Sequence, residues 1–163
     1  MTEYIYPSPI APIYLLADGE GLRIAAFEGQ SGYPDSVENI PVNNDNPHIA
    51  SAVKWFDCYF SGEVPDFTPE LKLTGSDFQQ AVWELLLAVP YGKTVTYGEL
   101  ARTVAEKRGV AKMSAQAVGN AVGRNPVAVI VPCHRVLGKG GKLTGYNGGI
   151  DKKAALLKIE KLL

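Results

Sequence analysis

Three short segments in the middle of the chain each open on a Ser or Thr and close on a Gly or Pro. They run from Ser76 to Pro90, from Thr96 to Gly109 and from Ser114 to Pro126. A hydroxyl side chain caps the first backbone N–H groups of a helix, and Gly or Pro ends it. Gln79 follows Ser76 at the spacing of a capping box. The sequence therefore predicts three consecutive helices, over 77–89, 97–107 and 115–122.

The residues before Ser76 follow a different pattern, in which short apolar runs alternate with turns. Asp18-Gly19-Glu20-Gly21 separates the apolar runs 13–17 and 22–27, an arrangement typical of a β-hairpin. Residues 31–46 are rich in Gly, Pro, Asn and Ser and predict a loop. Residues 47–60 carry apolar side chains at helical spacing, and 64–75 predicts a linker with room for one strand.

These patterns predict an α+β protein with two domains. Residues 1–73 are expected to form a small β-hairpin or sheet with a helix, which supports the fold. Residues 74–163 are expected to form a mainly helical domain. Its helices 97–107 and 115–122 make a candidate helix-turn-helix of the winged-helix kind, and the small side chains of the second helix permit close approach to a DNA groove.

Two further elements are predicted near the C-terminus. Residues 127–131 are the most apolar β-branched run of the chain and predict a buried strand that leads to Pro132. A Gly-rich loop follows, between Gly138 and Gly149. Asp151 is expected to cap a last helix that runs to Leu163.

The formal net charge of −1 hides a strong asymmetry. Up to Gly92 the chain holds 3 Lys or Arg against 13 Asp or Glu, whereas from Lys93 onward it holds 13 against 4. A basic C-terminal part favours a polyanion as partner, although an ordinary basic surface paired with the acidic half is the alternative. No apolar run approaches the ~20 residues that span a bilayer, and no secretory signal is evident, so a cytoplasmic protein without a membrane partner is expected.

Cys133 is the candidate nucleophile. It lies in Pro132-Cys133-His134-Arg135, where a base and a positive charge stand beside it. A thiol with a pKa near ~8.5 needs such a neighbour to become a nucleophilic thiolate. The alternative is a small buried hydrophobe, which is the interpretation kept for Cys58 on its amphipathic helix. These cysteines and the two histidines, His48 and His134, lack the paired spacing of a structural zinc site, so no metal is expected.

The residues around Cys133 resemble a known family. Ile130-Val131-Pro132-Cys133-His134-Arg135-Val136, followed by Leu143-Thr144-Gly145-Tyr146-Asn147-Gly148-Gly149, is similar to the O6-alkylguanine-DNA alkyltransferases, also called methylated-DNA–protein-cysteine methyltransferases. The similarity continues upstream through Pro90-Tyr91-Gly92-Lys93 and Val95-Thr96-Tyr97-Gly98-Glu99-Leu100-Ala101. It covers residues 74–163, whereas the N-terminal part matches only in outline.

The resemblance implies a suicide reaction on double-stranded DNA that contains O6-alkylguanine, which the family flips out of the duplex. Cys133 would keep the alkyl group permanently, after His134 removes its proton through a water and Glu160 orients His134. Asn125 would brace the segment before the acceptor. Tyr97 would rotate the target phosphate and donate a proton to the leaving guanine. No cofactor is implied, and a monomer is expected.

The resemblance also implies a set of substrate contacts, with one departure. Tyr146 and Asn147 would line the base pocket, and Arg124 and Arg135 are expected among the DNA contacts. Gln116 stands where the family carries an Arg that fills the gap left by the flipped base. Because Gln lacks the charge and reach of Arg, weaker or more salt-sensitive DNA binding is predicted. Arg124, eight residues further on, is a candidate for the missing charge, and the basic segment 105–112 is expected to add phosphate contacts.

Two other functions are open at this point. Alkyltransferase-like proteins keep the fold and the base flipping but replace the reactive cysteine, so Cys133 argues against them. A cysteine hydrolase would need a Cys and a His distant in sequence and an oxyanion hole, and neither is evident. The range of alkyl groups, and the acceptance of O4-alkylthymine, stay open as well.

Overall fold

The computed structural model describes residues 1–41 and 45–163. These residues form two compact units, of which Met1–Thr74 and Pro126–Ala128 make the first, and Gly75–Asn125 and Val129–Leu163 make the second. The first unit holds a three-stranded sheet and the second is mainly helical, so the predicted α+β class is confirmed. The chain leaves the second unit for residues 126–128, shortly before it reaches Cys133.

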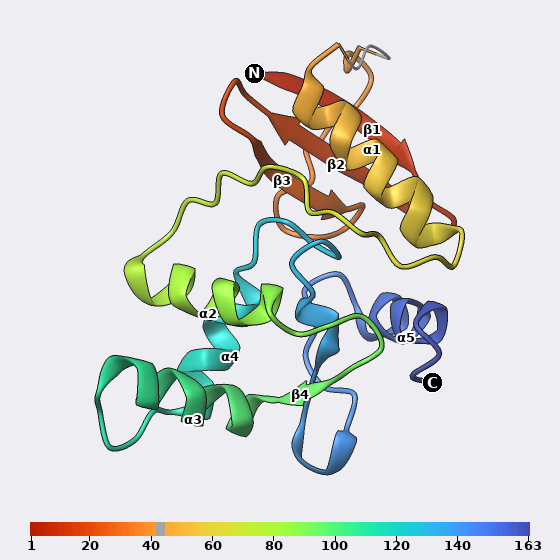
Figure 1. Cartoon of the computed structure of the whole chain (residues 1–163). Helices are drawn as coiled ribbons and strands as arrows, with labels where there is room; N and C mark the ends of the chain where they lie inside the picture. Colours follow the sequence, from red (N-terminus) through yellow and green to blue (C-terminus); the bar gives the residue numbers. More distant parts are fainter. Residues whose placement is uncertain (42–44) are drawn as a thin grey trace. The chain divides into compact units, whose positions relative to one another are not determined.

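In the first unit, strands β1 (Thr2–Pro7), β2 (Pro12–Ala17) and β3 (Leu22–Phe27) pair antiparallel in the order β1-β2-β3, and helix α1 (Pro47–Phe60) packs on the sheet (Figure 1). The predicted hairpin and helix are confirmed. Strand β1 was not predicted, because the prolines near the N-terminus obscured it. Pro7 ends the edge strand β1 and pairs with Pro12, the first residue of the central strand β2, and a missing N–H group is tolerated at both positions.

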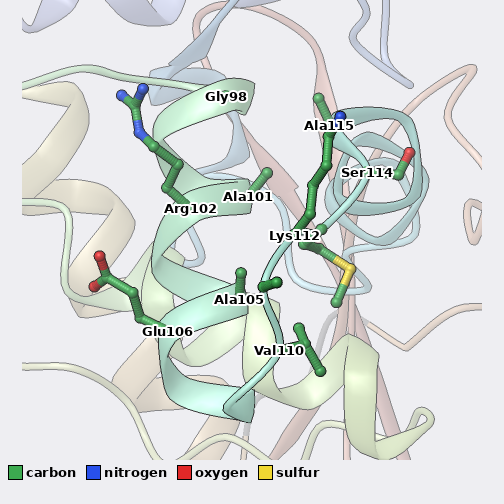
Figure 2. Close-up of a pocket in the computed structure, with 11 residues that line it drawn as sticks. Gly98, Ala101, Arg102, Ala105, Glu106, Val110, Lys112, Ser114 and Ala115 are labelled. Atoms are coloured by element: carbon green, nitrogen blue, oxygen red, sulfur yellow. The ribbon is translucent and has the colours of Figure 1, made fainter.

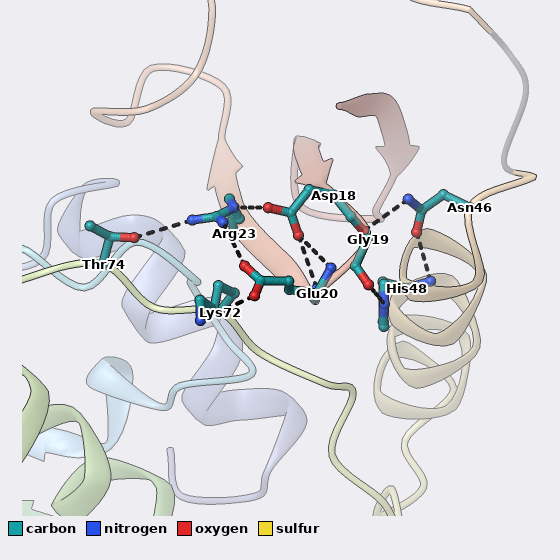
Figure 3. Close-up of polar contacts among 9 residues, drawn as sticks. Asp18, Gly19, Glu20, Arg23, Asn46, His48, Lys72 and Thr74 are labelled. Carbon is teal, nitrogen blue, oxygen red and sulfur yellow. Dashed lines mark hydrogen bonds and ion pairs between the residues drawn. The ribbon is translucent and has the colours of Figure 1, made fainter.

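A polar cluster fixes the turn between β2 and β3 (Figure 3). Asp18 Oδ1 accepts hydrogen bonds from the backbone N–H groups of Glu20 (2.7 Å) and Gly21 (3.1 Å), and its Oδ2 pairs with Arg23. Asn46 caps α1 through its Oδ1 and donates its Nδ2 to the Asp18 carbonyl over 3.1 Å. The hairpin turn and the start of α1 are therefore held by one amide side chain.

The linker and the loop of the first unit contain little regular structure. The linker forms one bridge, in which Leu22 N–H donates to Glu70 O (2.8 Å) and Lys72 N–H to Leu22 O (2.9 Å). The predicted loop 31–46 is a loop in its described part, and residues 42–44 lie outside the described residues.

The prediction of a strand over residues 127–131 is wrong. Val127 forms an isolated parallel bridge with Ala25, whose N–H donates to Pro126 O (3.0 Å) and whose carbonyl accepts from Ala128 N–H (2.8 Å). Val129 then adopts a φ of 70°, in the left-handed region that breaks an extended chain. All five residues of this run are buried, so their apolar character serves burial rather than a ladder.

Three capped helices form the body of the second unit, namely α2 (Asp77–Leu87), α3 (Tyr97–Arg108) and α4 (Ala115–Gly123) (Figure 1). The predicted capping box is present, since Ser76 Oγ accepts from Gln79 N–H and Gln79 Oε1 accepts from Ser76 N–H. Trp83 on α2 donates its Nε1–H to Ala121 O on α4 over 2.9 Å. The three helix predictions are confirmed, although α2 ends at Leu87 rather than at Val89.

The rest of the second unit consists of short pieces and one helix. Strands β4 (Val95–Thr96) and β5 (Val136–Leu137) form a parallel pair, and two 3-10 turns, η1 (Cys133–Arg135) and η2 (Lys139–Gly141), flank β5. Helix α5 (Ile150–Ile159) follows the Gly-rich loop. The expected cap at Asp151 is wrong, because the helix begins earlier. Gly149, with a φ of 104°, occupies the cap position and makes no side-chain cap bond.

Helix α5 also ends before the predicted Leu163. Lys161 has a φ of 60°, and its N–H donates to Lys158 O over 3.0 Å. The N–H of Leu162 donates to Leu157 O over 2.8 Å. These two bonds form a Schellman motif, which terminates a helix through a left-handed residue. Glu160 is thereby placed at the C-cap. Among the described residues, no helix is both long and apolar enough to cross a membrane.

Candidate active site around Cys133

Cys133 begins the 3-10 turn η1, and its residue is 7% exposed. The turn is fixed from upstream by Asn125, whose buried Nδ2 donates to Val131 O over 2.8 Å. This bond closes the loop 126–131 at its base, and the backbone N–H of Cys133 donates to the same carbonyl at 2.8 Å. Asn125 therefore holds the residues just before the thiol, and the segment that it holds is a loop rather than the expected strand.

His134, Arg135 and Glu160 form a buried hydrogen-bonded group. His134 Nε2 lies 2.5 Å from Glu160 Oε2, and Arg135 Nε donates to Glu160 Oε1 over 2.8 Å. The backbone N–H of Gly92 donates to the same Oε1 over 3.0 Å. The side chains of His134 and Glu160 are fully buried. A carboxylate is stable in such a place because several donors replace its water.

These contacts determine the protonation of the pair. Burial alone would raise the pKa of Glu160, but the hydrogen bonds from His134, Arg135 and the Gly92 backbone lower it to about 2. Burial lowers the pKa of His134, against the raising effect of Glu160. Near neutral pH the pair is therefore a carboxylate and a neutral imidazole. Since a carboxylate only accepts, the ring proton is assigned to Nε2, and Nδ1 carries the lone pair that can take a proton.

The Cys133 thiol rests in its protonated form. Burial raises the pKa of Cys133, while hydrogen bonds from Asn125 and Tyr146 and the positive charge of Lys153 lower it. Burial has the largest effect, so the net shift is upward. A buried, protonated thiol is unreactive until a base takes its proton, and a neutral imidazole is suited to that task.

Two tyrosines are near the thiol. Burial and the interaction with Cys133 raise the pKa of Tyr146 well above its usual value. Among the described residues, no oxygen or nitrogen accepts a hydrogen bond from its buried hydroxyl, whose hydrogen-bond partner is the thiol of Cys133. Tyr97 is half-buried, and its Oη lies 3.5 Å from the carbonyl oxygens of Thr144 and Gly145.

The residues predicted to contact DNA are not gathered around the thiol as the residues above are. Gln116 and Arg124 are exposed on α4 and at its C-cap, and Asn147 is exposed with its Nδ2 donating to Gly123 O over 3.3 Å. Arg135 was predicted to contact DNA, and this prediction is wrong. It is buried, it pairs with Glu160, and its Nη1 donates to Val89 O over 2.8 Å. The position of Arg135 close to Cys133 in the sequence does not reveal that its guanidinium group points inward.

A groove of about 510 Å³ lies between α3 and the segment before α4 (Figure 2). Ala101 and Ala105 of α3 lie on one side of it and Ala115 on the other, and its charged lining residues are Arg102, Glu106 and Lys112. None of the residues predicted around Cys133 lines this groove, whereas several residues of segment 105–112, which was predicted to contact phosphate, do. The acceptor site therefore does not include it.

Lys153 is the residue that the sequence interpretation missed. It is fully buried on α5, and its ammonium group donates to the carbonyl oxygens of Val136 (2.6 Å), Thr144 (2.8 Å) and Gly145 (3.3 Å). The signal was present in the spacing, because Lys153, Leu156, Leu157 and Glu160 share one helical face. Two charged residues on an otherwise apolar face indicate a buried polar site.

Two sequence families match this chain along almost its whole length. Residues 77–162 match the family described as 6-O-methylguanine DNA methyltransferase, DNA binding domain. Residues 1–73 match the family described as 6-O-methylguanine DNA methyltransferase, ribonuclease-like domain.

Individual relatives agree with these families. A methylated-DNA–protein-cysteine methyltransferase of Mycobacterium leprae is 46% identical over 154 residues, which cover 94% of this chain and 88% of the relative. One from Methanosarcina acetivorans is 43% identical over 160 residues, covering 96% of each. The crystal structure of Mycobacterium tuberculosis OGT in complex with DNA is similar with a TM-score of 0.83 and 43% identity, covering 99% of this chain and 93% of that one.

Proposed function

Because the chain belongs to the 6-O-methylguanine DNA methyltransferase family, we propose that it repairs DNA by moving the alkyl group of O6-alkylguanine onto its own Cys133. One observation carries the assignment of the acceptor. Cys133 is a free thiol followed directly by a neutral imidazole that a buried carboxylate holds in one tautomer. This is the arrangement by which a base activates a nucleophile.

The transfer is a single displacement at the alkyl carbon. Nδ1 of His134 takes the thiol proton through a bridging water, and the sulfur of Cys133 bonds to the alkyl carbon as the bond from that carbon to guanine O6 breaks. Glu160 stabilises the imidazolium that forms. The guanine anion takes up a proton, so the products are an S-alkylcysteine and an unmodified guanine. The atoms balance without a co-reactant, and each protein molecule acts once.

The tyrosines are suited to the leaving group. The Tyr146 hydroxyl is buried beside the thiol and has a proton to donate. Tyr97 begins α3, the first helix of the helix-turn-helix, so it can contact both the DNA backbone and the flipped base. In its roles as proton donor and phosphate contact, Tyr97 lowers the cost of expelling an anionic base. Asn147 lines the same pocket.

The reaction needs the base to be out of the duplex. We assign the groove contact to α4, whose residues Gln116 to Gly123 are small or uncharged. Gln116 fills the gap that the base leaves, and Arg124 contacts phosphate. Residues 1–73 support the fold, and residues 74–163 carry DNA binding and transfer. A cytoplasmic location fits a reaction that needs a reduced thiol.

One experiment tests this function. The protein is mixed with a duplex that contains O6-methylguanine, and its intact mass is followed. We expect the wild type and the matched control Cys58→Ala to gain one methyl group per molecule, and Cys133→Ala to gain none. A parallel duplex with O4-methylthymine measures the breadth of the reaction.

Two outcomes would contradict the proposal. If the wild type binds the lesion without any gain of mass, the chain is a binding module of the alkyltransferase-like kind. If it demethylates more than one equivalent of DNA, Cys133 is not a permanent acceptor.

A further inference from the structure

Lys153 is a buried cation to which the transfer step described above assigns no role. Its residue is 0% exposed, and all three ammonium hydrogens are directed at backbone carbonyl oxygens. In the part of the chain that the structure describes, no Asp or Glu forms an ion pair with it. A buried charge without a counter-ion is costly, so its presence needs a reason.

The three carbonyl groups belong to the two segments that enclose the thiol. Val136 follows η1 directly, and Thr144 and Gly145 precede Tyr146. The same two loop carbonyls lie 3.5 Å from Tyr97 Oη, and Lys153 Nζ lies 5.9 Å from the centre of the Tyr97 ring. One ammonium group thus joins the segment that carries the acceptor to the loop that carries the base pocket.

Charge is the second part of the argument. The titratable groups that face Lys153 are Cys133 and His134 of η1, Tyr97 of α3, and Tyr146, which interacts with the same thiol. Burial lowers the pKa of Lys153 to about 8, and Cys133 counteracts this shift. Lys153 is therefore charged near neutral pH, and among these groups the thiolate of Cys133 is the anion that its charge favours.

We propose that Lys153 is a positioning residue that supplies the fixed positive charge for the Cys133 thiolate and holds the base-pocket loop against the acceptor turn. The thiolate exists only once His134 has taken the proton, so the charge is arranged before it is needed. Interactions prepared in this way favour the reacting state over the resting one. The same charge opposes protonation of His134 in the resting protein, which keeps the base ready.

This inference rests on the proposed function because it explains how Cys133 is activated for alkyl transfer. The effect of Lys153 on the thiol can nevertheless be measured without DNA. In a Cys58→Ala background, the rate of alkylation of Cys133 by iodoacetamide is measured against pH. Lys153→Met keeps the length of the side chain without its charge, Lys153→Arg keeps the charge, and Lys158→Met is a matched control on the exposed side of α5. We expect Lys153→Met to move the midpoint of the rate profile upward by about one pH unit, which lowers the rate near pH 7.5 by roughly tenfold.

Lys153→Arg keeps the charge, so the midpoint of its rate profile should stay close to that of the wild type. Lys158→Met should leave the profile unchanged. A folded Lys153→Met protein with the wild-type midpoint would overturn the inference. Since Lys153→Met leaves three carbonyl groups without a donor, it can fail to fold, and a second measurement uses the unaltered side chain. The pKa of Lys153 is followed by NMR of labelled lysine before and after Cys133 is alkylated.

Coupling between two groups is reciprocal. Alkylation prevents formation of the thiolate, so in the pH range where the unaltered thiol ionises, Lys153 should lose its proton at lower pH in the alkylated protein than in the unaltered one. Identical titration of Lys153 in the two proteins over that range would contradict the coupling. The two proposals can fail separately. A protein that gains no methyl group from DNA but shows this coupling contradicts only the proposed function. A protein that repairs DNA with a profile independent of Lys153 contradicts only the role of Lys153.

Discussion

His134 Nε2 and Glu160 Oε2 lie 2.5 Å apart, with both side chains fully buried. The two residues come from different elements, since one is in the turn η1 and the other caps the end of α5. The bond fixes the orientation of the imidazole and selects the tautomer in which Nδ1 is the proton acceptor.

Glu160→Gln should slow the transfer and destabilise the protein. The amide keeps the shape of the side chain but no longer stabilises the imidazolium, so the single-turnover rate should fall by roughly 100-fold or more. Arg135 would lose its counter-ion inside the protein, which typically costs about 3–5 kcal/mol. Rapid-quench transfer assays and urea unfolding check both effects against Glu84→Gln, an exposed control. A wild-type transfer rate in the folded variant would contradict this role of Glu160.

Stability should fall with acid in a defined window. The pKa of Glu160 is lowered to about 2 in the folded protein from a usual value of 4.5, so its contribution is fully present above pH 4.5 and is lost as the pH falls toward 2. Such a shift corresponds to roughly 3 kcal/mol. His134, whose pKa is lowered by burial, adds a loss that begins as the pH falls through 6.5. Urea midpoints measured from pH 8 to 2 should decline over both ranges, and Glu160→Gln should remove the steeper decline below pH 4.5.

Asn125→Ala should reduce both stability and thiol reactivity. The substitution leaves the buried Val131 carbonyl without its side-chain donor, at a cost of about 1–3 kcal/mol. It also removes a hydrogen bond that lowers the pKa of Cys133, so the alkylation profile should move to higher pH. Asn125→Asp should be worse, because an acceptor then meets the carbonyl. The idea fails if both variants alkylate with the wild-type pH profile.

Gln116→Arg should strengthen DNA binding. An added guanidinium on the exposed side of α4 makes one more phosphate or base contact, so the slope of log affinity against log salt should steepen by about 0.9. Affinity for lesion and undamaged duplexes is measured by fluorescence anisotropy over a range of salt concentrations. Gln80→Arg, an exposed change on α2, is the matched control. Equal effects of the two substitutions would reduce Gln116 to an ordinary surface position.

Local signals predicted the helices well, because Ser76, Thr96 and Ser114 satisfy helix-end N–H groups within their own segments. The run 127–131 misled the prediction for the opposite reason. Its β-branched residues are buried, but the left-handed Val129 depends on tertiary packing and on Asn125, which spacing does not encode.

Some residues of the candidate site could be predicted from the sequence, and others could not. Cys133, His134 and Glu160 were identified through a resemblance, and the hydrogen bond between the last two is present in the structure. The inward direction of Arg135 and the three carbonyl partners of Lys153 come from segments far apart in the chain. A sequence pattern records that a charge is on a buried face, but not which backbone groups meet it.

The end of α5 has a consequence for how the protein tolerates mutation. Glu160 owes its direction to Lys161, whose left-handed backbone stops the helix one residue after the carboxylate. Gly or Asn at position 161 adopts that conformation easily, whereas Val or Ile does not. In a saturation library, position 161 should therefore accept Gly and Asn and reject β-branched residues, although Lys161 is exposed. The requirement for a correctly oriented His134, the proposed base, thus extends to a surface residue that takes no chemical part in the proposed reaction.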